Sequence, residues 1–68
     1  MDRIHYEVSG LINADRKIKV KKTLDKVKGV QEVEVNVAEG TVDVSFNSPA
    51  TEEQIEQSIE KQGCVIVN

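Results

Sequence analysis

At 68 residues the chain is long enough for one small domain and too short for two. Its net charge of −3 at pH 7 argues against nucleic acid as the main ligand, and no stretch approaches the ~20 apolar residues of a membrane span. The single cysteine, Cys64, has no disulfide partner within the chain, which favours a reducing compartment. We therefore expect one cytoplasmic domain over residues 1–68, without a signal peptide.

The first third of the chain predicts a strand followed by a helix. Residues 4–8 alternate apolar and polar side chains, which is typical of a half-buried strand. Asn13 is a good N-cap, and Gly29 is a plausible end for the helix that follows. The apolar stripe of this helix consists of Val20, Leu24 and Val27.

The middle of the chain predicts a β-hairpin. Residues 33–37 and residues 42–46 both alternate between apolar and polar side chains. The residues between them, 38–40, end in a glycine and have hairpin-turn chemistry. Asn47, Ser48 and Pro49 then break the pattern.

The last third predicts a second helix and a short strand. Thr51 followed by Gln54 is typical of a capping box, and Gly63 is expected to close the helix. Residues 64–67 form the last predicted strand. The element order is then βαββαβ, which predicts an α+β, ferredoxin-like two-layer sandwich: a four-stranded antiparallel sheet with both helices on one face.

Several stretches of this sequence resemble the heavy-metal-associated domain family, which includes small copper chaperones and the N-terminal modules of copper-transporting P-type ATPases. The similar stretches are residues 6–11, 20–30, 33–36, 40–46 and 59–63. The resemblance extends over essentially the whole chain without a gap. It implies the same ferredoxin-like fold, a non-enzymatic role and a place in metal-ion homeostasis.

The loop after the first strand departs from the family pattern Gly-Met-x-Cys-x-x-Cys. It runs from Gly10 to Arg16, and by the resemblance Leu11 stands for the methionine while Asn13 and Arg16 stand for the two cysteines. Copper(I) is a soft cation that prefers thiolates, whereas Asn13 offers a hard amide oxygen and Arg16 a positive charge with donors only. We therefore expect no metal site and no cofactor.

Cys64 leaves a second interpretation open. By the resemblance it lies next to the metal loop, so two copies of the chain would be able to share one copper ion through two Cys64 thiolates. The simpler interpretation is that Cys64 is a small buried apolar residue.

Arg16 lies near the inward edge of the first helix, where its charge is unfavourable to the helix dipole and needs a negative partner. Asp15 or a carboxylate near the last strand would supply one. The alternative is a pocket for a small anion. The residues of that weaker candidate site are Ser9, Gly10, Asn13 and Arg16.

Basic residues crowd the first helix and surround one apolar side chain, Ile18, that is expected to be exposed. By the resemblance, this face would dock an acidic protein partner such as a metal-transporting ATPase or a related module, with the chain itself a monomer. The alternative is that the lysines only solvate the helix. The docking candidates are Ile18, Lys19, Lys21, Lys22 and Lys26.

Two other classes of function are not supported. An RNA-binding sheet of this topology would display aromatic side chains on its open face, which here is expected to be acidic. Nucleophilic catalysis would need Cys64 beside His5, but the alternation places them on opposite faces of the sheet. We predict no catalytic residues.

Overall fold

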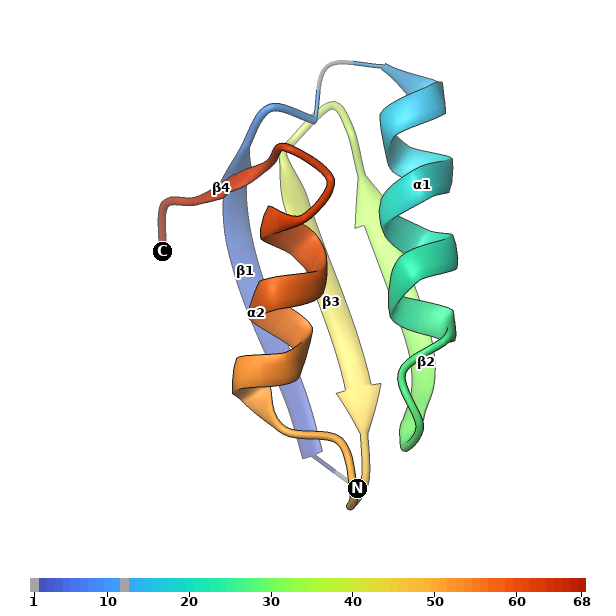
Figure 1. Cartoon of the computed structure of the whole chain (residues 1–68). Helices are drawn as coiled ribbons and strands as arrows, with labels where there is room; N and C mark the ends of the chain where they lie inside the picture. Colours follow the sequence, from blue (N-terminus) through green and yellow to red (C-terminus); the bar gives the residue numbers. More distant parts are fainter. Residues whose placement is uncertain (1, 12) are drawn as a thin grey trace.

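A computed structural model describes residues 2–11 and 13–68 of the chain. It contains six elements in the predicted order βαββαβ (Figure 1). Met1 and Ile12 lie outside the described residues. Met1 is the first residue of the predicted domain, and Ile12 belongs to the Gly10–Arg16 loop. The elements are β1 (Asp2–Ser9), α1 (Ala14–Asp25), β2 (Val30–Asn36), β3 (Thr41–Phe46), α2 (Glu52–Glu60) and β4 (Val65–Ile66).

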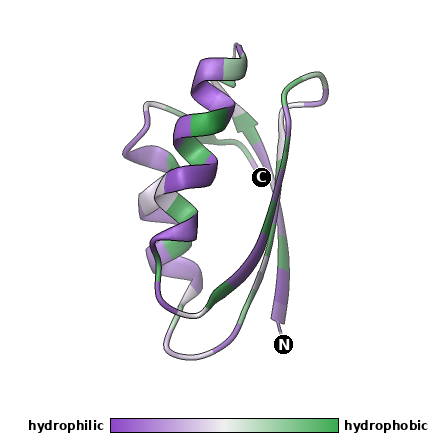
Figure 2. Cartoon of the chain, turned by 90° about the vertical axis from the view of Figure 1, so that its right-hand side faces the viewer, coloured by the Kyte–Doolittle hydropathy of each residue, from purple (hydrophilic) through white to green (hydrophobic). Residues whose placement is uncertain are grey.

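The four strands form one antiparallel sheet in the order β2-β3-β1-β4. Both helices cover the same face of this sheet, so the molecule has two layers (Figures 1 and 2). This arrangement confirms the predicted ferredoxin-like fold.

The core lies between the sheet and the helix layer. Leu24 of α1 and Ile55 and Ile59 of α2 are fully buried there, against Val42 and Val44 of β3. Burying a side chain of this size stabilises the fold by about 1.5–3 kcal/mol. The alternating strand residues and the helix stripes therefore meet as the sequence pattern predicts.

The second helix begins as predicted. The Thr51 hydroxyl accepts a hydrogen bond from the Gln54 backbone N–H at 3.2 Å, and the Gln54 side-chain oxygen accepts one from the Thr51 N–H at 3.3 Å. These reciprocal bonds satisfy two of the amide groups that a helix start leaves without partners.

Both helices end earlier than the glycines suggested. α1 ends at Asp25 and α2 at Glu60, not at Gly29 and Gly63. After each helix the chain continues in tighter turns, in which an N–H bonds the carbonyl three residues back: Val27 to Leu24, and Gln62 to Ile59. Tightening of this kind is common in the last turn of a helix.

Two of the predicted strands also differ from the observed strands in where they begin or end. β2 begins at Val30, not at residue 33, because a bulge between Val30 and Glu32 takes Val30 out of the alternation. β4 comprises only Val65 and Ile66, so Cys64 lies between the preceding turn and the strand rather than within the strand.

Candidate functional site

The loop after β1 packs against the turn that precedes β4. Gly10 has a φ of 99°, and a Cβ atom placed on it would lie 3.2 Å from the Gly63 carbonyl oxygen and 3.4 Å from Cys64 Cα. This close approach favours glycine because the backbone segments are nearly in contact. The loop that corresponds to the family's metal site therefore lies beside Cys64, as the sequence predicted.

Asn13 caps α1. Its backbone is extended, and its side-chain oxygen accepts a hydrogen bond from the Arg16 backbone N–H at 2.9 Å. The predicted N-cap is confirmed. The amide oxygen that would be a hard ligand is thus engaged in holding the first turn of the helix.

Arg16 connects the start of α1 to the end of α2. Its Nη1 atom donates a hydrogen bond to the Gln62 backbone carbonyl oxygen at 2.6 Å, in a partly buried position. A Cβ atom on Gly63 would lie 2.6 Å from the same Nη1, so a larger residue there would displace the guanidinium from this position.

The partner of Arg16 differs from the carboxylate that we expected from the sequence. Gln62 directly follows α2 and its C-cap, Lys61, and carbonyls at a helix C-terminus carry partial negative charge and lack partners within the helix. The negative end of α2 therefore provides the counter-charge that Arg16 needs at the positive end of α1.

Cys64 is buried, with 2% of its surface exposed, and is a free thiol. It packs into the same core cluster as Val8 and Leu11, which agrees with its interpretation as a small apolar residue. Within residues 2–11 and 13–68, no three His, Cys, Asp or Glu side chains gather into a group that would hold a metal ion.

The weaker candidate for an anion pocket stays a prediction. Ser9 is exposed at the end of β1, while the Arg16 N–H and its Nη1 atom already have partners in Asn13 and Gln62. An anion at the Gly10 loop would have to compete with both hydrogen bonds.

The predicted docking residues lie on the exposed side of α1. Ile18 is 49% exposed, and the four lysines named with it are exposed as well. Figure 2, which faces the side of the molecule where α1 lies, shows this helix as mostly hydrophilic. Within the described residues, His5 and Asp43 are the one pair of basic and acidic side chains within 4.0 Å of each other, so no carboxylate lies this close to these ammonium groups.

Among the described residues, the open face of the sheet carries no aromatic platform and no cysteine. Tyr6 and Phe46, the two aromatic residues of the chain, are buried in the core. His5 Nδ1 lies 2.8 Å from Asp43 Oδ1 across β1 and β3, on the face away from Cys64. His5 is therefore engaged in a surface pair, which the sequence pattern did not predict.

A second interaction that the sequence did not predict joins β1 to α2. The Tyr6 hydroxyl donates a hydrogen bond to Glu56 Oε2 at 3.1 Å. Burial, and next the hydrogen bond with the Glu56 carboxylate, raise the pKa of Tyr6 well above its usual range. The strand alternation shows only that Tyr6 faces inward, and the helix partner follows from the packing.

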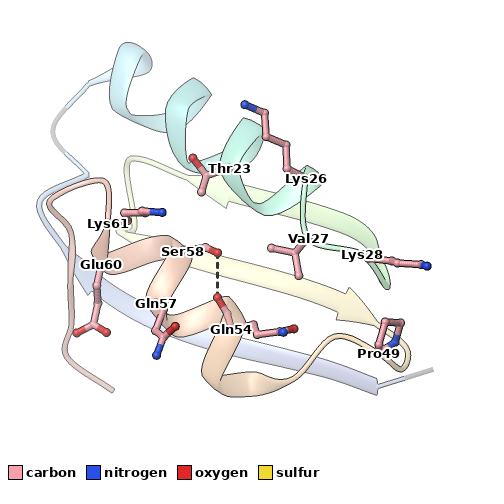
Figure 3. A pocket seen from close by; sticks show the side chains of 10 residues that line it. All are labelled: Thr23, Lys26, Val27, Lys28, Pro49, Gln54, Gln57, Ser58, Glu60 and Lys61. Atoms are coloured by element: carbon pink, nitrogen blue, oxygen red, sulfur yellow. Dashed lines mark hydrogen bonds between the residues drawn. The ribbon is translucent and has the colours of Figure 1, made fainter.

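A groove between α1 and α2 was likewise not predicted. Its lining comes from the end of α1, the turn after it, the loop before α2, and α2 with its C-cap (Figure 3). The residues that line it are Thr23, Lys26, Val27, Lys28, Pro49, Gln54, Gln57, Ser58, Glu60 and Lys61.

None of the described residues forms a helix with the length and apolar character needed to cross a lipid bilayer.

Comparison with known proteins identifies the class to which this fold and loop belong. The sequence model of the heavy-metal-associated domain matches residues 8–64, which is most of the chain. The chain belongs to the heavy-metal-associated domain family, a family of non-enzymatic domains.

Solved structures support the same assignment. The CopZ metallochaperone superposes with a TM-score of 0.93 at 28% identity, over 97% of this chain and 100% of that one. A copper-binding domain from HMA7, a P-type ATPase, gives 0.89 at 30% identity, over 100% and 96%. The N-terminal domain of a potential copper-translocating P-type ATPase from Bacillus subtilis gives 0.87 at 26% identity, over 94% and 81%. Curated protein sequences gave no significant match.

Proposed function

We propose that this chain is a metallochaperone-like interaction module of metal-ion homeostasis, which does not bind copper(I) as a monomer and docks an acidic protein partner through α1. The hydrogen bond from Arg16 to the Gln62 carbonyl is the observation that carries the proposal. A guanidinium links the loop to the turn before β4, in the region where the family's thiolates would face a metal ion.

The chemistry of this region argues against a copper site. A permanent positive charge beside the loop repels a cation, and Arg16 has no lone pair to donate to one. Asn13 uses its oxygen as a helix cap. The chain has one cysteine where copper(I) would prefer two thiolates.

Sharing of copper between two copies through Cys64 is disfavoured by burial. With 2% of its surface exposed, the thiol would have to leave the core cluster before it met the thiol of a second chain. That movement would cost apolar burial and would open a cavity. The single cysteine thus supports a structural role in a reducing compartment such as the cytoplasm.

The exposed face of α1 supports the docking part of the proposal. Ile18 provides an apolar contact, and the surrounding lysines provide the positive field that speeds encounter with an acidic surface. A metal-binding domain of a P-type ATPase, or a related module, is the proposed partner.

Restoring the thiolates tests the metal part of the proposal. In competition with a chromogenic copper(I) chelator, the variant carrying Asn13→Cys and Arg16→Cys should take up one copper ion per chain, while the native chain takes up none. The variant with Asn13→Ser and Arg16→Ser is the matched control, because it removes the same side chains without adding thiols. Equal copper uptake by the native chain and the cysteine variant would contradict the proposal.

Association kinetics test the docking part. Replacing Lys19, Lys21 and Lys22 by glutamine should lower the on-rate for a P-type ATPase metal-binding domain of the same organism about tenfold at low salt, and less as salt rises. Arg3→Gln, on β1 away from α1, should leave the on-rate unchanged. An unchanged rate for the lysine variant would count against the face.

A further inference from the structure

The lining of the groove between α1 and α2 contains more lysines than carboxylates. Three lysines, Lys26, Lys28 and Lys61, line it together with one carboxylate, Glu60. In the part of the chain that the structure describes, the contact between His5 and Asp43 is the one contact within 4.0 Å between a basic and an acidic side chain. No carboxylate therefore lies within 4.0 Å of these three ammonium groups.

The helices leave this groove open because long polar side chains line it where large apolar ones would close it. One hydrogen bond crosses between the two sides, from Gln62 Nε2 to Thr23 Oγ1 at 2.9 Å. Other polar bonds of the lining residues stay within one helix: Thr23 donates to the Lys19 carbonyl in α1, and in α2 Ser58 donates to the Gln54 carbonyl and Gln57 to Glu53. Figure 3 shows the side chains of both sides along the groove.

The lining combines three kinds of contact that suit a peptide. The ammonium groups bind carboxylates, and Val27 and Pro49 offer apolar contact. The Gln54 side-chain N–H groups and the Gln57 side-chain oxygen, which the bonds named above leave free, can bond a peptide backbone. A longer polyanion fits less well, because α2 also carries carboxylates that would repel its flanks. These are Glu52, Glu53, Glu56 and Glu60.

We propose that the groove between α1 and α2 receives an extended acidic segment of the docking partner, with its carboxylates paired to Lys26, Lys28 and Lys61. The inference rests on the proposed docking function and adds to it a second contact region, which shares Lys26 with the docking residues around Ile18. The three lysines of the lining, against one carboxylate, favour an acidic peptide as the occupant.

The test measures binding of a short peptide of alternating glutamate and leucine by chemical shifts of the backbone amides at low salt. We expect shifts at Val27, Gln54 and Gln57, and none with the same peptide carrying lysine in place of glutamate. Replacing both Lys28 and Lys61 by glutamine should weaken binding about five- to tenfold, since each surface pair contributes up to about 1 kcal/mol.

A matched variant separates this inference from the docking function on which it rests. The variant with Lys19→Gln and Lys22→Gln removes the same charge from α1 outside the groove, and should weaken peptide binding less than twofold. If this variant loses the peptide while the groove variant keeps it, the groove is wrong and docking on the face of α1 stands. If both variants bind like the native chain, both proposals fail. Equal shifts with inorganic phosphate would overturn the preference for a peptide.

Discussion

The link between Arg16 and Gln62 predicts a loss of stability when the guanidinium is removed. A hydrogen bond from a charged donor contributes about 1.5–3 kcal/mol, and the lower end applies here because the pair is only partly buried. Arg16→Ala would also relieve the unfavourable charge at the start of α1, which returns about 0.3–1 kcal/mol. The hydrogen bond is the larger contribution, so we expect a net loss of about 1 kcal/mol.

Thermal unfolding followed by circular dichroism measures this difference. For a domain of this size, a loss of about 1 kcal/mol lowers Tm by roughly 4–8 °C. Lys17→Ala is the matched control, because Lys17 is an exposed cation in the same turn and should change the stability by less than about 0.5 kcal/mol. A Tm for Arg16→Ala equal to or above that of the native chain would refute the reasoning.

Three further predictions follow from contacts outside this loop. Burial raises the pKa of Tyr6 above its value in the unfolded chain, so at high pH the folded protein keeps the phenol proton that the unfolded chain loses. The free energy of unfolding should therefore fall as pH rises above about 10. In urea titrations over this pH range, Tyr6→Phe should show a weaker fall. Thr51→Ala removes the cap of α2 and should cost about 0.5–2 kcal/mol in urea denaturation, whereas Ser48→Ala, an exposed change in the preceding loop, should cost less than about 0.5 kcal/mol. Ile59→Ala should cost about 2–5 kcal/mol by leaving a cavity in the core, and a cost below 1 kcal/mol in the same assay would contradict the packing described for α2.

The fold was predictable because its signals are local. Asn13 and Thr51 are followed within three residues by the groups that they bond, and buried side chains alternate with less buried ones over residues 33–36 and 42–46. The errors fall where this regularity is broken: at the bulge beside Val30, and in the tightened turns after α1 and α2.

The sequence predicted which residues lie in the candidate site, but it did not predict all of the contacts that they make. The resemblance correctly placed the Gly10 loop beside Cys64. The partner of Arg16 is a backbone carbonyl 46 residues away, exposed by the way α2 ends, and no side-chain pattern marks it. The bond from Tyr6 to Glu56 and the groove likewise depend on how α2 packs against its neighbours, which composition and spacing do not specify.

A copper(I) titration of the native chain, monitored with a competing chelator beside the Cys64→Ser variant, tests the central claim most directly. The account predicts that neither protein removes copper from the chelator, because an amide that caps a helix and a guanidinium bonded to a carbonyl leave no pair of sulfur ligands. One tightly held copper ion per monomer, retained in Cys64→Ser, would contradict it.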